Sequence, residues 1–553
     1  MGIFEGNRLS FTRLSFTRLS FTRLSFARLS FALLFALLAL ATTASLLTGC
    51  GEEAQTRGTF SYAESSEPAS LDPAQVEEVA GINVARYLFD GLVGYDSQTS
   101  EIKPAVAESW ESNDDSTEYT FHLRKGVKFT DGSEVKAGDF VYGWTRALTS
   151  SGSTASSILQ PVKGASDLAD GKTDRLAGVQ ALDDYTLKVM LDYPMADFVS
   201  LLGYPAASPV PRQAVENAET KFAEHPTGNG PFRIREWSHE DKIVLERNPD
   251  YYGDAARLDE VTVRIIPNPA TAVAELKAGN IDAVRAIPPG QTEALRNDSS
   301  VGFYQGAADE VRFLSFDSTK PPFDNEKVRQ AFAAAIDRDT IANKVLQGQA
   351  QPADGLVPTN VPGHQSGAMP YEYDPEKAKS LLSEAGYPGG AGLPPLTLNY
   401  AGVGPAADVA QAIQAELREV GITVEIAGLE GGAFLEQMHG GNLSLFLIAW
   451  QADAPNVDGY LFPLFDTENI GATNVFRYSN PMVDDLLGRA RSTTDADART
   501  GLYNDAERKI LGDVPVVPVL FSQQTLVYSP RVSRFVVTPL GDIALNEVTV
   551  SSK

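Results

Sequence analysis

The feature that most constrains the fold is a regular alternation of apolar strands and amphipathic helices in the C-terminal half of the chain. Strand, helix, strand, helix and strand are predicted in turn over residues 396–400, 409–420, 422–426, 434–438 and 443–450. Consecutive strands joined by helices run parallel, and parallel sheets are covered by helices on both faces. This half of the chain is therefore predicted to be an open α/β unit.

The end of the last of these strands is a candidate binding site. Trp450, Gln451 and Asp453 follow the apolar run of 443–450 directly. In open parallel sheets, ligands bind beyond the carboxyl ends of the strands. A carboxylate in such a position is a functional candidate, although a loop or cap aspartate and a core tryptophan are the alternatives.

The rest of the chain also mixes strands and helices. Further strands are predicted over 59–63, 119–123, 179–191, 261–265 and 281–284, and further helices over 82–89, 272–276, 325–347 and 375–385. Asp374-Pro375-Glu376 supplies an N-cap, a first-turn proline and a first-turn acid to the last of these helices. With 553 residues, the chain is expected to form more than one domain.

Motifs of catalysis and of metal binding are missing. The five histidines show no metal-ligand spacing, and there is no Gly-x-Ser-x-Gly sequence. Gly171-Lys172-Thr173 resembles the end of a phosphate loop, but Ser166 stands where that motif requires glycine. We therefore expect no enzyme, no metal site and no cofactor. An enzyme whose residues meet only in space is the alternative.

The first 49 residues are predicted to be a secretory signal. Five arginines in a repeated Arg-Leu-Ser-Phe-Thr/Ala unit precede an apolar run, residues 31–47, that ends in Leu47-Thr48-Gly49-Cys50. This end has the lipobox pattern of bacterial lipoproteins, in which the cysteine is lipidated and becomes the first residue. A single membrane-spanning anchor is the alternative, but the run is shorter than the ~20 residues that a spanning helix needs. Cys50 is also the chain's one cysteine.

The charge of the chain argues against polyanionic partners. The net charge is −26, and the basic leader contributes +4 of it, so the remainder carries −30. Such a protein repels nucleic acid and anionic membrane faces. No cysteine is left for disulfides, so packing alone must stabilise the fold outside the cell.

Several segments together resemble the oligopeptide- and dipeptide-binding proteins of ABC importers, which form family 5 of the extracellular solute-binding proteins. The segment Trp110–Trp144 carries a strand that enters Leu-Arg-x-x-x-x-Phe-x-Asp-Gly. The other matching segments, in order, are 70–73, 88–92, 229–232, 244–253 and 322–338. Each motif is weak by itself, but the set covers nearly the whole chain after the leader.

The resemblance implies an α/β, two-lobed, type II periplasmic-binding-protein clamp with an extra inserted α+β domain. After a tether over 50–57, lobe I would comprise 58–89, 211–318 and 528–553. The inserted domain would span 90–210, and lobe II 319–527. The lobes would be joined by two hinge crossings, near 318 and 528.

The resemblance also implies roles for individual residues. Ala449-Trp450-Gln451-Ala452-Asp453 matches the family's Gly-Trp-x-Ala-Asp, in which the aspartate pairs with the peptide's α-ammonium and the tryptophan lines a side-chain pocket. Glu77-Glu78-Val79 aligns with a stretch that pairs with the ligand backbone, or else is a solvated acidic loop.

Three residues depart from the family pattern. Ala449 replaces a glycine, and Asp90 replaces the commoner glutamate. Leu447 stands where some members keep a basic residue for the ligand's carboxylate. These departures leave the peptide length open.

The implied function is capture of short peptides for import by a permease and its ATPase subunits. The protein would be a monomer, held to the outer face of the cell membrane by lipid on Cys50. Two alternatives remain: a non-peptide solute such as an oligosaccharide or metal chelate, and a lipoprotein that senses peptides without transport.

Overall fold

The computed structural model describes residues 58–551, with gaps at 77, 151–154, 218–220, 289, 403–404 and 539. The predicted leader, the tether and Cys50 lie outside these residues. Among the helices that are described, none combines the length and the apolar character needed to cross a membrane.

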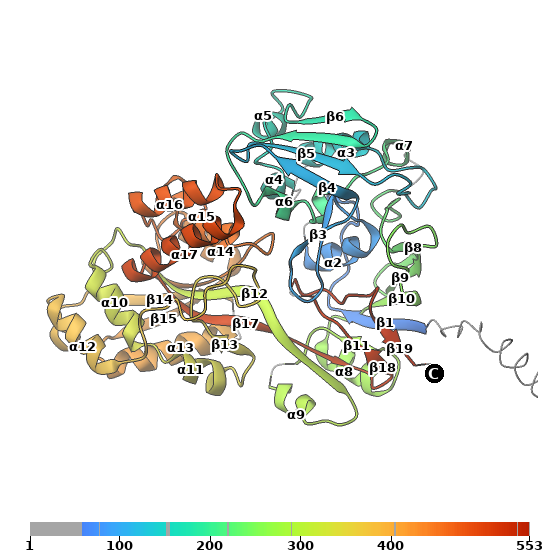
Figure 1. The fold of residues 1–553 in the computed structure, drawn as a ribbon. Coiled ribbons are helices and arrows are strands. Elements are labelled where there is room, and N and C mark those ends of the chain that lie inside the picture. The colour runs from blue at the N-terminus through green and yellow to red at the C-terminus, as the bar shows by residue number, and fades with distance from the viewer. Residues whose placement is uncertain are drawn as a thin grey trace, which may run out of the picture. The chain divides into compact units, whose positions relative to one another are not determined.

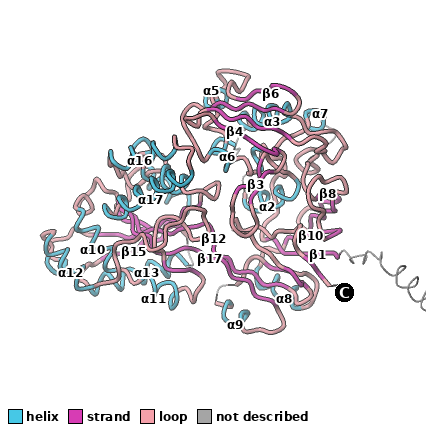
Figure 2. The backbone as a smooth tube through the Cα atoms, in the orientation of Figure 1, coloured by secondary structure: helices cyan, strands magenta, loops and turns pink. Residues whose placement is uncertain are grey.

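The largest sheet in the described chain is mixed, with both parallel and antiparallel strand pairs (Figures 1 and 2). Its strands, in spatial order, are β15 (Val424–Leu429), β14 (Leu396–Ala401), β16 (Leu445–Gln451), β12 (Gly302–Phe316), β17 (Val516–Tyr528), β11 (Ala283–Val284), β1 (Gly58–Glu64), β10 (Leu258–Ile265), β9 (Lys242–Arg247) and β8 (Phe232–Ser238). The short strand β13 (Ala350–Pro352) pairs with β17.

The predicted parallel unit is confirmed. β14 pairs in parallel with both β15 and β16, and β16 then pairs antiparallel with β12. The two faces are covered by helices, which are α10 (Glu326–Ala335), α11 (Arg338–Thr340), α12 (Pro375–Glu384), α13 (Pro405–Glu419), α14 (Gly431–His439), α15 (Asp458–Phe465), α16 (Pro481–Arg491) and α17 (Ala496–Asp513). β16 is buried at Leu445 and Phe446, whereas the residues from Leu447 to Gln451 are partly or fully exposed.

The predicted helix over 325–347 is interrupted. α10 ends at Ala335, and Ile336 has extended backbone angles (φ −97°, ψ 116°). The Asp337 carboxylate then accepts the Thr340 N–H at 2.9 Å and caps a new helical turn. An aspartate that caps in this way competes with continuation of the preceding helix. At 375–384, by contrast, the predicted Asp374 cap is confirmed, since its carboxylate accepts the Lys377 N–H at 2.9 Å.

The long antiparallel pair β12–β17 joins two hydrophobic cores. Val301 and Val527 belong to one core, and Val311 and Phe521 belong to another. Between them the β12–β17 register shifts, so residues 308–310 bulge from the ladder. This crossing from one core to the other lies before residues 318 and 528, and the two hinge crossings near those residues stay a prediction. Because both strands run through it without a turn, no loop residue marks the crossing in the sequence.

On one side of this crossing, which we call lobe I, β1 lies between β10 and β11 and is parallel to both. The remaining elements of lobe I are α2 (Val79–Leu88), α7 (Arg212–Glu216), α8 (Pro269–Lys277), α9 (Thr292–Arg296), β18 (Val532–Arg534) and β19 (Thr549–Val550). The other side, built on β14–β16 and α10–α17, we call lobe II.

Residues 90–210, which we call the inserted domain, have a core of their own around Phe121, Phe140 and Trp144. Its four-stranded antiparallel sheet has the order β4 (Ala107–Ser112), β5 (Glu118–Leu123), β7 (Thr186–Met190) and β6 (Val179–Asp183). Its other elements are β2 (Val93–Tyr95), β3 (Ile102–Pro104), α3 (Ala137–Thr149), α4 (Ala155–Ile158), α5 (Ala165–Ala169) and α6 (Phe198–Leu201).

A buried carboxyl lies in the bulge of β12. Asp309 is 1% exposed, and neither of its carboxyl oxygens has a hydrogen-bond partner among the described residues. Burial raises its pKa to about 7; Arg86 opposes the rise, while Asp542 and Glu310 add to it. An aspartate in the unfolded chain has a pKa of about 3.9. Between these values the folded state holds a proton that the unfolded state has lost, so this group's contribution to stability falls as pH rises.

We expect Asp309→Asn to raise the melting temperature at pH 8 by roughly 2–4 °C, because it removes a buried charge without a hydrogen bond. At pH 5 the native carboxyl is protonated, so the substitution should change little. Differential scanning calorimetry at both pH values measures the difference. The exposed Asp174, changed to Asn, serves as the control. An equal shift at pH 5 and pH 8 would contradict the assignment.

Candidate functional site

A cavity of about 930 Å³ lies where β12 and β17 cross between the lobes. Lobe I contributes α2 and residues 285–292, and lobe II contributes 345–350, 405–408 and 451–453. The crossing strands line it with Ala308, Glu310, Arg312 and the run Ser522–Leu526. Both lobes and the two strands that connect them therefore border the same space.

Two carboxylates lie where the parallel strands end. Asp408 stands in the first turn of α13, which follows β14, and Asp453 follows β16. Both line the cavity. Neither forms an ion pair with a cation of the described residues, so this end of the cavity is acidic.

The Asp453 side chain reaches the cavity yet is closely surrounded by protein. The residue is exposed to solvent on the side that faces the cavity. The protein atoms packed around it on the other sides desolvate its carboxyl and raise the pKa of that group. A hydrogen bond from Ser157, on α4 of the inserted domain, opposes that rise. A carboxylate in such a setting gains more from a cationic partner than one in open water, because the effective dielectric is lower.

The neighbours of Asp453 divide between the two faces of β16. Gln451 lines the cavity, and it stands opposite Glu310 of β12. Successive side chains of a strand point to opposite faces, so Trp450 lies on the other side. There it packs against the lobe II core, and its indole N–H donates to the Gly459 carbonyl at 2.9 Å.

Trp450 thus packs as an aromatic of the lobe II core, and its role in a ligand side-chain pocket stays a prediction. Ala449 is exposed, but neither Ala449 nor Trp450 is among the described residues that line the cavity.

The acidic stretch at 77–79 is only partly described. Glu77 lies outside the described residues. Glu78 has extended backbone angles (φ −89°, ψ 153°), and its carboxylate accepts the Ala69 N–H at 2.8 Å. Val79 lines the cavity and is the first residue of α2, so it is helical in this structure, and its pairing with a ligand backbone stays a prediction.

Sequence reasoning found Gln451 but missed the other amide side chains of the site. Among the described lining residues are five glutamines: Gln347, Gln349, Gln451, Gln523 and Gln524. A side-chain amide both donates and accepts hydrogen bonds. The polar run Ser522–Thr525, inside an otherwise apolar strand, was the signal that could have revealed part of this set.

The arginines of the site were missed as well, and no local pattern marks them. Arg86 lies 2.5 Å from Asp542, and Arg285 lies 3.5 Å from Glu64. Arg312 lies 3.0 Å from Glu310 on its own strand. Each lining arginine therefore already has a carboxylate partner, and the partners of the first two come from distant parts of the chain.

The lining has little aromatic or metal-binding character. Tyr204 is the one aromatic side chain among the described lining residues. Within the described ranges, no group of three or more His, Cys, Asp or Glu side chains is arranged to hold a metal ion.

Comparison with known proteins identifies the family. Residues 101–472 match the model of the bacterial extracellular solute-binding proteins, family 5. The chain is 30% identical over 550 residues to heme-binding protein A of Haemophilus influenzae, with 94% of this chain and 99% of that protein covered. It is 32% identical over 488 residues to the periplasmic oligopeptide-binding protein OppA of Escherichia coli K12, covering 85% and 88%.

Solved structures agree with these matches. The periplasmic murein tripeptide-binding protein MppA, in its unliganded open form, superposes with a TM-score of 0.81 at 29% identity, over 90% of this chain and 98% of that one. A binding protein DppA from Helicobacter pylori, in complex with the peptide STSA, gives 0.72 at 28% identity, over 91% and 100%. The chain belongs to the bacterial extracellular solute-binding proteins of family 5, which are binding proteins of the oligopeptide and dipeptide type and not enzymes.

Proposed function

We propose that this protein captures short peptides outside the cytoplasm and delivers them to an ABC permease. The α-ammonium of the peptide pairs with Asp453, and the lobes close over the ligand. Cys50 carries the lipid that holds the protein at the membrane, with residues 50–57 as a tether.

The observation that carries the proposal is the setting of Asp453. Its carboxylate lines the cavity at the end of a parallel strand, without a cation from the described residues. An ammonium that enters the cavity supplies the missing charge. Charge-assisted hydrogen bonds of this kind contribute roughly 1.5–3 kcal/mol each.

The size and the lining of the cavity suit a peptide. Its volume of about 930 Å³ falls within the range of roughly 300–1,000 Å³ typical of small-ligand sites. The five lining glutamines can bond to peptide N–H and C=O groups alike. Such contacts hold a peptide without reading its side chains.

The relatives leave room for other solutes. One is named for heme and others for glutathione. A haem favours an axial ligand such as His or Met, and a sugar favours aromatic surface. Tyr204 is the one aromatic ring among the described lining residues. Glutathione is itself a short peptide with a free amine and fits the same site. A protein that senses peptides without transporting them would bind the same peptides. Peptide uptake by the cell would then not depend on that protein.

Substituting Asp453 tests the amine contact. Isothermal titration with a mixed di- to pentapeptide pool should show Asp453→Asn weakening binding by roughly 10- to 100-fold, from the loss of a charge-assisted bond. N-acetylation of the pool should abolish binding to the unsubstituted protein. Asp408→Asn is the matched control, since it removes a second carboxylate of the same cavity. Binding of the N-acetylated pool would contradict the proposed role of Asp453.

The lipid anchor has a separate test. We expect the full chain, expressed in a bacterium, to enter the detergent phase of a phase-separation assay, and Cys50→Ser to stay in the aqueous phase. Lipid chains provide this partition, and removing the thiol removes their attachment site. Mass spectrometry of the mature N-terminus should show acylation at Cys50. Equal partition of both proteins would exclude this anchor.

A further inference from the structure

The loop that carries Asp453 lies between two bodies. Ala452 and Val457 belong to the core of lobe II, whereas Ala454 is packed in the core of the inserted domain. The buried Asn456 donates its side-chain amide to the Ser200 hydroxyl of α6 at 2.5 Å. Its carbonyl oxygen accepts the Gly459 N–H at 2.8 Å, so the same side chain joins the inserted domain to the start of α15.

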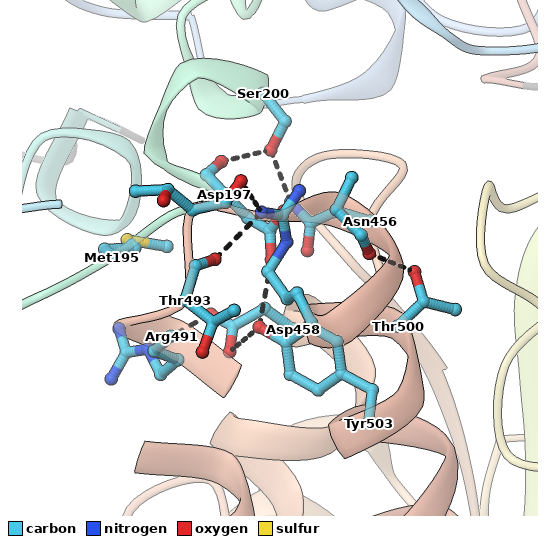
Figure 3. Close-up of polar contacts among 12 residues, drawn as sticks. Met195, Asp197, Ser200, Asn456, Asp458, Arg491, Thr493, Thr500 and Tyr503 are labelled. Carbon is cyan, nitrogen blue, oxygen red and sulfur yellow. Dashed lines mark hydrogen bonds and ion pairs between the residues drawn. The ribbon is translucent and has the colours of Figure 1, made fainter. Parts of the chain in front are cut away.

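The inserted domain is fixed to lobe II beside this loop (Figure 3). Asp197 accepts a hydrogen bond from the Tyr503 hydroxyl at 2.9 Å and lies 3.2 Å from Arg499, both of α17. The same Tyr503 hydroxyl lies 3.1 Å from Asp458, at the start of α15. The backbone N–H of Ala196 donates to the Arg491 carbonyl at 2.7 Å.

Arginine and aromatic side chains complete the contact. The Arg491 guanidinium lies 3.4 Å from Asp458 and stacks 3.7 Å from the ring centre of Phe462 in lobe II and 4.8 Å from that of Tyr193 in the inserted domain. Across the boundary, the stacking of Arg491 on Tyr193 adds to the Asp197–Arg499 ion pair and to the hydrogen bonds described above. The contact therefore acts as a firm support for the loop.

The inserted domain is held to lobe I as well. Arg146 of α3 donates to the Asp72 carboxylate through its two terminal guanidinium nitrogens, Nη1 at 2.7 Å and Nη2. The Asp90 carboxylate accepts the hydroxyls of Tyr251 and Tyr252, each at 2.8 Å. The domain thus spans both lobes and reaches the cavity edge, where Ser157 also bonds to Asp453 directly.

We propose that the inserted domain positions the Asp453 loop for the ligand's amine, with Ser200 and Asp197 as positioning residues. This inference rests on the proposed function of Asp453. A binding group must be held to within a fraction of an ångström by its supports to select one geometry. Here part of that support comes from outside the lobe that carries the loop.

The experiment compares two serines of the inserted domain. Ser200 and Ser208 are 1% and 2% exposed, but only Ser200 contacts the loop; the Ser208 hydroxyl has no partner among the described residues. Titration with the mixed di- to pentapeptide pool should show Ser200→Ala weakening binding by roughly three- to tenfold, the range expected for one lost hydrogen bond, and Ser208→Ala leaving it unchanged. Tyr503→Phe, which removes the hydroxyl shared by Asp197 and Asp458, should act in the same direction as Ser200→Ala.

A double-mutant cycle separates positioning from general destabilisation. If Ser200 acts through Asp453, Ser200→Ala should have no further effect in an Asp453→Asn background. Hydrogen exchange of the 452–457 amides should also be faster in Ser200→Ala than in Ser208→Ala. Equal effects of the two serine variants, or additive effects with Asp453→Asn, would overturn the positioning role. Normal binding by Asp453→Asn itself would instead overturn the proposed function.

Discussion

The antiparallel pairing of β12 with β17 is the interaction on which the rest of the structure depends. It carries the sheet from one hydrophobic core to the other, and its register shift between Ala307 and Val311 opens the ladder locally, followed by a second shift between Arg312 and Phe313. Bulges bend strands, so the crossing is suited to act as a hinge. The ligand cavity is lined by the same stretch, including Ala308, Glu310 and the run Ser522–Leu526. Rotation about this stretch would therefore change the shape of the site directly.

The inserted domain adds a second connection between the lobes, made of side-chain contacts and a backbone hydrogen bond and not of continuous strands. Its bonds to Asn456 and to α17 support the loop that presents Asp453, while its bonds to Asp72 and to Tyr251 and Tyr252 hold it to lobe I. Asp453, the proposed amine-binding carboxylate, thus lies on a loop supported by lobe II and by the inserted domain. A ligand contact that is built this way can be selective for an ammonium while the glutamines of the lining stay tolerant of side chains.

Local patterns were sufficient for elements whose signal lies in a few neighbouring residues. The apolar periodicity of α13, the β-branched run of β15 and the Asp374 cap of α12 all appear as expected. The break after Ala335 was missed because Asp337 satisfies a backbone N–H locally and ends the helix that periodicity alone would continue. Trp450 shows the opposite limit, since a motif match says nothing about which face of a strand a side chain occupies. Pairs such as Arg86–Asp542 and Asn456–Ser200 join distant segments, and no pattern within one segment predicts them.

The central claim is that a peptide lies between the lobes with its amine on Asp453. The most direct test is a crystal structure of the protein loaded with peptide from the mixed pool. The account predicts electron density in the cavity between α2 and β16, with the peptide nitrogen at hydrogen-bond distance from the Asp453 carboxylate and the carbonyl groups facing the glutamines. A ligand bound elsewhere, or one that turns its carboxylate or side chain to Asp453, would contradict it.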